Sequence, residues 1–249
     1  MPNLVVSDRE GVRVITLNRP DVLNAFDTPL YEACGEALRD AQARDHVKCV
    51  VLTGAGRAFS SGQDLAEMAA IDPGASGVRH GFPALIDTVA AFDKPFLCAV
   101  NGVGIGVGMT VLLHADIALI DETARLRAPF APLGVVPEAA GSVLMPAIMG
   151  NQRAALALYA GDWITADEAV AAGLALRSVP AGTVLEETVA IAERIAAMPL
   201  ASLVETKRLV IAGRIDAIRA ARAREDAAFA RLLGGTANAA ALQAFLGRG

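Results

Sequence analysis

The sequence predicts an α/β fold, in which helices cover a sheet and a helical portion follows. One observation is a unit that occurs twice: an apolar segment typical of a strand buried on both faces, a glycine-rich loop, and the start of a helix. The apolar segments of these units are residues 49–53 and 95–100. The other observation is that the pattern becomes purely helical after about Thr183. Strands that alternate with helices are typical of the α/β class.

The composition excludes several classes of protein. Of the 249 residues, 54% are hydrophobic and 20% are charged, which allows a large core and argues against disorder. The net charge of −5 argues against a nucleic-acid partner. Glycines and polar residues interrupt the longest apolar stretch, residues 95–120, so no membrane span is predicted. Because the cysteines lack metal-site spacing and no secretory signal is visible, we expect a soluble cytoplasmic protein.

The first expected elements are a hairpin and a helix. Residues 4–6 and 12–17 are apolar segments joined by a short turn, which predicts two paired strands. A helix is predicted from about Asp27 to Arg44, because Asp27 is a good capping residue and Pro29 suits the first turn.

The first strand–loop–helix unit comes next. Its strand is residues 49–53, and its loop, GAGRAFSSGQDL at residues 54–65, leads into a helix. Residues 72–77 contain proline and glycines and predict a flexible loop, and a second helix is predicted at residues 82–91.

The second unit has the same order. Its strand is residues 95–100, its glycine-rich loop NGVGIGVG is residues 101–108, and residues 109–115 open a helix. Short strands are predicted at residues 117–121 and 124–127.

Helices alone are predicted in the C-terminal part. The first of them ends at Pro199, because proline cannot continue a helix, and two or three more reach Leu246. We predict a core of residues 1–195 and a helical region of residues 196–249. Since this helical region has little core of its own to join, we expect it to make subunit contacts.

The two glycine-rich loops are candidate binding sites. Each precedes a helix, where backbone N–H groups are free to hold a phosphate or an oxygen that becomes negative during a reaction. Neither loop matches a P-loop or a dinucleotide-binding fingerprint. Tight packing at a strand-to-helix turn would explain one such loop, whereas two in consecutive units favour a shared anion site.

Other catalytic and metal motifs are absent from the sequence. His46, His80 and His114 are far apart, so no metal site is predicted, and His114 in an apolar helix is typical of a hydrogen-bonded core histidine. The serines lack the nucleophile-elbow motif of hydrolases. The arginines between residues 208 and 231 alternate with acidic residues, as on a solvated helix face.

Glu138 is the one charged residue in PLGVVPEAAGSVLMP, residues 132–146. A surface carboxylate at a helix start is one interpretation, because Pro137 to Ala140 suits a first turn and a negative charge is favoured there. From residue type alone, this interpretation is preferred over a catalytic role.

Four ordered segments nevertheless resemble the enoyl-CoA hydratase/isomerase (crotonase) superfamily, from near Leu17 to about Val179. They are LNRPDVLNAFD (17–27), VVLTGAGRAFSSGQDL (50–65), KPFLCAVNGVGIGVGMTVLLHADI (94–117) and APLGVVPEAAGSVLMPAIMG (131–150). Residues 163–180 are also similar to the family's segment after the active site. The resemblance implies a crotonase-like spiral of ββα turns with a C-terminal helical region, assembled as a homotrimer or a hexamer.

The same resemblance implies roles for the loops. Backbone N–H groups of Gln63 and Val107 would form an oxyanion hole for a thioester oxygen. Coenzyme A would enter as part of the substrate, with no separate cofactor. Because Asp21 stands where many relatives have a basic residue, Lys207 or a neighbouring arginine, in this subunit or another, would contact a phosphate instead. The other implied CoA-binding residues are Val22, Leu23, Ser61, Gly62, Asp64 and Leu65, beside Asp21 itself.

The reaction is implied by the departures from the family pattern. The two glutamates of the hydratases are replaced by Thr110 and Phe130, whereas Glu138 is similar to the single glutamate of peroxisomal-type Δ3,Δ2-enoyl-CoA isomerases of fatty-acid β-oxidation. An apolar pocket would raise the pKa of Glu138 and suit it to carry a proton. The alternatives are hydration or another crotonase reaction on the same enolate, and a non-catalytic CoA- or RNA-binding relative.

Overall fold

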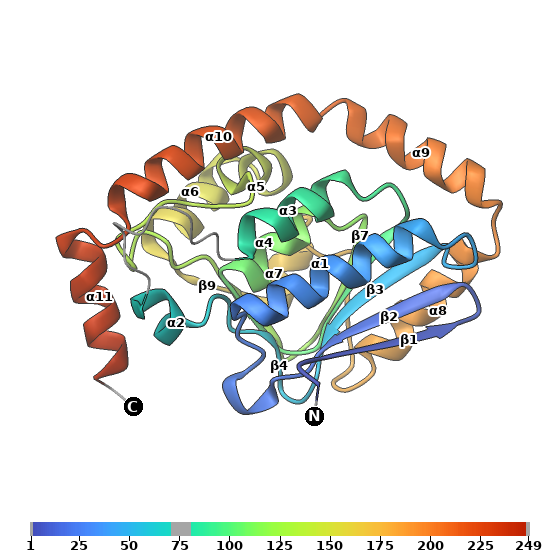
Figure 1. The fold of residues 1–249 in the computed structure, drawn as a ribbon, viewed down its shortest axis with the longest axis horizontal. Helices are drawn as coiled ribbons and strands as arrows, with labels where there is room; N and C mark the ends of the chain where they lie inside the picture. Colours follow the sequence, from blue (N-terminus) through green and yellow to red (C-terminus); the bar gives the residue numbers. More distant parts are fainter. Residues whose placement is uncertain (1, 71–80, 248–249) are drawn as a thin grey trace.

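The computed structural model describes residues 2–70 and 81–247 and confirms the α/β class (Figure 1). Within these residues the strands form two sheets. The six-stranded sheet has the order β1 (Leu4–Arg9), β2 (Val12–Leu17), β3 (Cys49–Gly54), β5 (Phe96–Val100), β7 (Ile117–Asp121) and β10 (Arg177–Val179). The four-stranded sheet has the order β4 (Ala58–Ser60), β6 (Val103–Ile105), β8 (Arg125–Arg127) and β9 (Trp163–Thr165).

The larger sheet carries the core on both faces. β1 and β2 form the predicted antiparallel hairpin, and the other neighbours are parallel, with Leu52 opposite Cys98. Side chains of alternate residues belong to two separate apolar clusters, Val50 and Leu52 to one and Val51 to the other. This is why the central strands are continuously apolar.

Helices cover the two faces of this sheet. α1 (Thr28–Ala43) and α3 (Phe82–Ala91) pack on one face and α8 (Val184–Ala196) on the other. The predicted cap of α1 is confirmed, since the Asp27 side chain accepts a hydrogen bond from the Leu30 N–H at 2.9 Å. The helix predicted at 82–91 is also confirmed, whereas the loop predicted at 72–77 lies outside the described residues.

The glycine-rich loops contain strands that the sequence pattern did not predict. β4 lies within residues 54–65 and β6 within residues 101–108, and the two strands pair in parallel. Gly102 is required at this contact, because a Cβ atom there would lie 2.2 Å from the Arg57 carbonyl oxygen. Each unit is therefore a ββα turn, and the pairing brings its loop beside the other one.

The remaining helices complete the fold. The segment predicted as one helix at 109–115 is α4 (Val107–Thr110) followed by the 3-10 helix η2 (Val111–His114). Others in the core are η1 (Pro20–Val22), α2 (Leu65–Ala70), α5 (Gly141–Met149), α6 (Asn151–Ala160) and α7 (Ala166–Ala171). The C-terminal helices are α9 (Leu200–Ala212), α10 (Ile215–Leu232) and α11 (Thr236–Leu246), which gives the upper number of the two or three predicted after Pro199.

The C-terminal helices contact the core at several places. α10 packs on α5, and α11 lies near α2 (Figure 1). The predicted boundary between residues 195 and 196 falls at the end of α8 and stays a prediction. In the described part of the chain, no helix has the length and apolarity that crossing a bilayer requires.

Candidate active site

A cavity of about 660 Å³ lies where the two glycine-rich loops meet. Residues of η1, α2, β8, the segment before α5 and the end of α10 also line it. Nearly all of the predicted site residues line it: Asp21, Val22, Leu23, Ser61, Gly62, Gln63, Asp64, Leu65, Val107 and Glu138. The structure thus brings together residues that are more than a hundred positions apart in the sequence.

Glycines allow the two loops to approach each other. Gly62 has a φ of 91°, and a Cβ atom on it would lie 2.6 Å from the Ile105 carbonyl oxygen. A Cβ atom on Gly108 would lie 2.5 Å from the Ser60 carbonyl oxygen. Any side chain at either position would therefore push the two backbones apart.

The backbone N–H of Gln63 is left free by the pairing around it. Gln63 forms a parallel bridge with Phe26, in which the Phe26 N–H donates to the Gly62 oxygen at 2.7 Å and the Asp64 N–H donates to the Phe26 oxygen at 2.8 Å. A parallel bridge of this kind uses the groups on either side of the central residue, not its own N–H. Among the described residues, none accepts a hydrogen bond from the Gln63 N–H.

Val107 has a free N–H for a different reason. It is the first residue of α4, and the first N–H groups of a helix have no intrahelical partner. The N–H groups of Met109 and Thr110 both donate to the Gly106 oxygen, while no described residue accepts from the N–H of Val107. Two unused donors, one from each loop, therefore border the same cavity.

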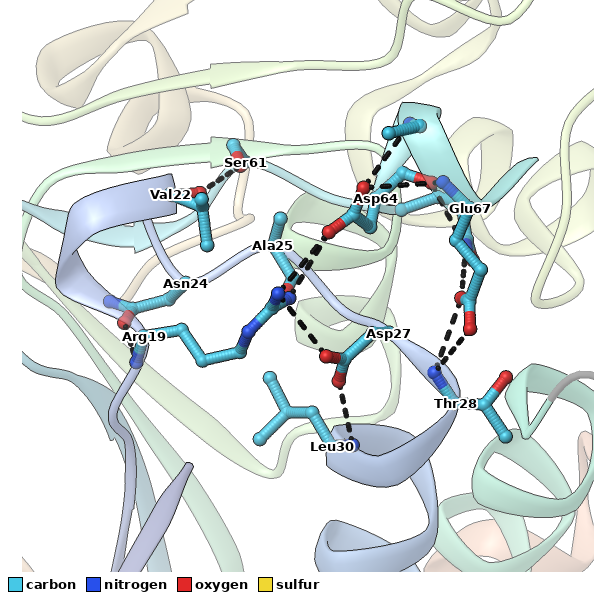
Figure 2. A network of polar contacts seen from close by, with 12 residues as sticks. Arg19, Val22, Asn24, Ala25, Asp27, Thr28, Leu30, Ser61, Asp64 and Glu67 are labelled. Atoms are coloured by element: carbon cyan, nitrogen blue, oxygen red, sulfur yellow. Dashed lines mark hydrogen bonds and ion pairs between the residues drawn. The ribbon is translucent and has the colours of Figure 1, made fainter. Parts of the chain in front are cut away.

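Arg19 fixes the η1 turn against the first loop (Figure 2). Its guanidinium donates to the Ala25 oxygen at 2.6 Å and pairs with Asp27 at 3.2 Å and Asp64 at 3.3 Å. The Ser61 hydroxyl also donates to the Val22 oxygen, at 3.2 Å. The predicted CoA-binding segment from Asp21 to Leu23 is thereby held beside the residues that follow Ser61.

The side chain of Gln63 is fixed as well. Its amide oxygen accepts from the buried Tyr31 hydroxyl at 2.9 Å, and its amide nitrogen donates to Glu67 at 3.2 Å. Glu67 in turn accepts from the Thr28 N–H at 3.0 Å (Figure 2). These bonds restrain the residue whose backbone N–H borders the cavity.

Glu138 is half-buried and lines this cavity together with a second one, of about 750 Å³, between α3 and α10. Burial raises the pKa of its carboxyl to about 8, and the negative charges of Glu225 and Asp226 act in the same direction. The interpretation of Pro137 to Ala140 as a first helical turn is wrong. Ala139 and Ala140 have φ values of 58° and 60°, and α5 begins only at Gly141.

The positions of the missing hydratase glutamates are both buried. Phe130 lines the cavity, and Thr110 is fully buried, with a hydroxyl that has no hydrogen-bond partner among the described residues. Neither side chain titrates, so neither can serve as an acid or a base.

Lys207 does not line the cavity. It is buried, and its ammonium donates to Asp116 at 2.8 Å and to the Lys94 oxygen at 2.9 Å. The structure therefore does not bring Lys207 to the other predicted CoA-binding residues. Of the described residues, the cations that line the cavity are Arg57 and Arg127. Neither was predicted, although Arg57 lies inside the first glycine-rich loop.

Two interpretations of the other polar residues can be compared with the structure. His114 is buried, hydrogen-bonded to the Ala139 oxygen at 2.8 Å, and has a pKa lowered to about 4 by burial, which confirms a core histidine. Within residues 2–70 and 81–247, no group of acidic, histidine or cysteine side chains is arranged to hold a metal ion.

Repeated ββα turns around such a cavity are the fold of the crotonase-like enzymes. The structure superposes on a solved enoyl-CoA hydratase/isomerase of Pseudoalteromonas atlantica with a TM-score of 0.94 and 33% identity, over 99% of this chain and 98% of that one. A probable enoyl-CoA hydratase of Rhodobacter capsulatus is 35% identical over 95% of this chain and 92% of its own length. The human enoyl-CoA delta isomerase 2 is 32% identical over 89% of this chain and 57% of its own length.

Residues 7–249 match the Enoyl-CoA hydratase/isomerase family. The chain belongs to that family and is an enzyme that acts on acyl-CoA substrates. The relatives carry both hydratase and isomerase names, so membership of the family does not determine which reaction the chain catalyses.

Proposed function

We propose that the protein is a Δ3,Δ2-enoyl-CoA isomerase in which Glu138 is the single acid and base. The main support comes from the surroundings of the three carboxylates that line the cavity among the described residues, Asp21, Asp64 and Glu138. Asp64 is paired with Arg19, and Asp21 is exposed on η1. Glu138 has a raised pKa and lines the same cavity as the residues with the free N–H groups.

The proposed reaction moves one proton. The N–H groups of Gln63 and Val107 hold the thioester oxygen, and Glu138 removes a proton from C2. The electrons of the C2–H bond delocalise onto that oxygen as a dienolate. Glu138 then returns the proton to C4, so that the double bond moves from C3–C4 to C2–C3. No water is consumed, and one titrating group suffices.

We propose that coenzyme A lies along Asp21 to Leu23 and along residues 61–65. Both segments line the cavity and are held together by the bonds of Arg19 and Ser61. Arg57 is exposed at the same cavity and is the proposed cation for a CoA phosphate, in place of Lys207. This arrangement leaves Lys207 in its ion pair with Asp116.

Hydration is the second candidate, because a relative with 35% identity is named a probable hydratase. In that reaction Glu138 would activate a bound water molecule. Without a second titrating group at Thr110 or Phe130, Glu138 would also have to deliver the proton to C2. A single group that performs both steps is expected to hydrate slowly.

Two substrates separate these reactions. We expect 3-enoyl-CoA esters to be converted to 2-enoyl-CoA, and 2-enoyl-CoA esters to give little 3-hydroxyacyl-CoA. Both products are scored by chromatography, with acyl chains of several lengths. Faster formation of the 3-hydroxy product than of the isomer would reject the isomerase proposal in favour of hydration.

The pH dependence is a further expectation. Only ionised Glu138 can accept the C2 proton, and its pKa is raised to about 8. Because the raised pKa keeps the carboxyl protonated at neutral pH, kcat/KM for isomerisation should rise with pH and level off above about pH 9. The measurement is kcat/KM at constant ionic strength from about pH 6 to pH 10. A profile that is flat between pH 7 and pH 9 contradicts the assignment of Glu138.

Assembly and pathway stay predictions. Leu209 and Val210 on α9 are 77% and 63% exposed, which supports subunit contacts through the region 196–249 and the expected homotrimer or hexamer. A role in fatty-acid β-oxidation is also a prediction, and its only support is the proposed isomerase reaction.

A further inference from the structure

We propose that Glu225, on α10, is a positioning residue that holds the turn carrying Glu138 in the conformation needed for proton transfer. This inference rests on the proposed function, because it concerns the group assigned there as acid and base. It assigns the C-terminal helical region a part in the reaction of its own subunit, beside the expected subunit contacts.

The contact is a two-pronged hydrogen bond. Glu225 is 5% exposed, and its two carboxylate oxygens accept from the Ala140 N–H at 2.7 Å and from the Ser142 N–H at 2.8 Å. These donors lie on either side of Gly141, where α5 begins. A carboxylate at this place also interacts favourably with the positive end of the α5 helix dipole.

The turn needs such a restraint because its backbone is strained. Ala139 and Ala140 follow Glu138 directly, and both have positive φ values. The left-handed conformation is unfavourable for a residue with a side chain. A turn with two such residues in succession persists only when its surroundings fix it.

A second restraint acts from the opposite side. His114, at the end of η2, is bonded to the Ala139 oxygen at 2.8 Å. Its lowered pKa keeps the ring neutral, and a carbonyl can only accept, so the Nε2–H is the donor. Since η2 continues directly from α4, this bond links the turn of Glu138 to the helix that begins at Val107.

α10 is itself anchored, so Glu225 is not on a free helix. One turn earlier, Arg222 pairs with Asp87 on α3. The helix also packs on α5. The Glu225 carboxylate is therefore fixed relative to both α3 and α5.

Glu225 also affects the pKa of Glu138. Among the described residues, the titratable or charged side chains near Glu138 or on the walls of its two cavities are Asp21 on η1, Tyr31 on α1, Arg57 and Asp64 in the first loop, Asp87 on α3, His114 on η2, Arg127 on β8, and Arg219, Arg222, Glu225 and Asp226 on α10. Arg222 is paired with Asp87, and Arg219 with Asp216. Burial raises the pKa of Glu138 most, and the negative charges of Glu225 and then Asp226 raise it further.

The test is Glu225→Gln, with Asp226→Asn as its matched control. Glutamine keeps one acceptor but cannot serve both N–H groups, and it carries no charge. We expect kcat for isomerisation to fall about 10- to 100-fold with KM little changed, and the inflection of the pH profile to move to lower pH. Asp226 is exposed and contributes only charge, so Asp226→Asn should move the inflection downward and leave the plateau of kcat unchanged.

A second variant tests the inference if Glu225→Gln fails to fold. Glycine adopts a positive φ without strain, so Ala140→Gly added to Glu225→Gln should restore the fold and part of kcat. A folded Glu225→Gln protein with the wild-type kcat and pH profile would overturn the inference, and so would a folded double variant with no recovery of kcat. The proposed function fails separately, when Glu138→Gln itself retains isomerase activity.

Discussion

Glu138→Gln is expected to lower the rate of 3-enoyl-CoA isomerisation by about 10²–10⁴-fold, the usual cost of losing a general base. Glutamine has nearly the same shape but cannot accept and return a proton at neutral pH. The proposed oxyanion donors are backbone groups of Gln63 and Val107, which line the same cavity, so the substitution leaves them in place. Binding of an acyl-CoA should therefore be retained while turnover is lost.

The experiment compares kcat and the dissociation constant of a saturated acyl-CoA for the wild type and the variant. Glu36→Gln, at an exposed position of α1, is the matched control and should behave as the wild type.

Because the pKa of Glu138 is raised on folding, ionising it costs stability as the pH rises from 4.5 through about 8. Glutamine has no such cost, so at pH 9 the variant should unfold no more easily than the wild type. Isomerisation at the wild-type rate by Glu138→Gln would remove the main support for the proposed mechanism.

Much of the fold could be predicted from local chemistry. The cap at Asp27 and the helix at 82–91 depend on residues that are close in the sequence, and both are confirmed. The strands β4 and β6 were missed because each has only three residues and lies within a glycine-rich loop. β4 and β6 lie in different loops and pair with each other, so no local periodicity in the sequence indicates this pairing.

The candidate site could also be predicted only in part. The resemblance of the sequence motifs to the family predicted which segments border the cavity, and these segments do meet there. The conformation of the Glu138 turn was predicted wrongly, because Pro137 and Glu138 are good first-turn residues and nothing nearby shows that Ala139 and Ala140 are left-handed. The carboxylate that holds this turn is 85 residues away from Ala140 in the sequence. Likewise, the ion pair of Lys207 with Asp116 is invisible to sequence spacing.

The two loops form one unit, and this determines how a glycine substitution should act. The free N–H of Val107 depends on where α4 begins, and α4 lies against the first loop through Gly108. The free N–H of Gln63 depends on the bridge to Phe26, just after Gly62. Moving either backbone by a fraction of an ångström changes the separation of the two donors. An oxyanion hole tolerates little of this, since its donors act at hydrogen-bond distance.

Gly108→Ala is accordingly expected to lower kcat by about 10²–10³-fold, as the loss of one oxyanion donor does. The added Cβ atom would lie 2.5 Å from the Ser60 carbonyl oxygen, which belongs to the backbone of β4 and cannot rotate away. The start of α4, with the Val107 N–H, has to shift instead. Gly213→Ala is the control, because a Cβ atom there meets nothing within 4 Å and its φ is negative. The measurement is kcat at saturating 3-enoyl-CoA, with circular dichroism to show that the fold is kept. A folded Gly108→Ala protein that turns over as fast as Gly213→Ala would exclude the loop of Val107 from the oxyanion hole.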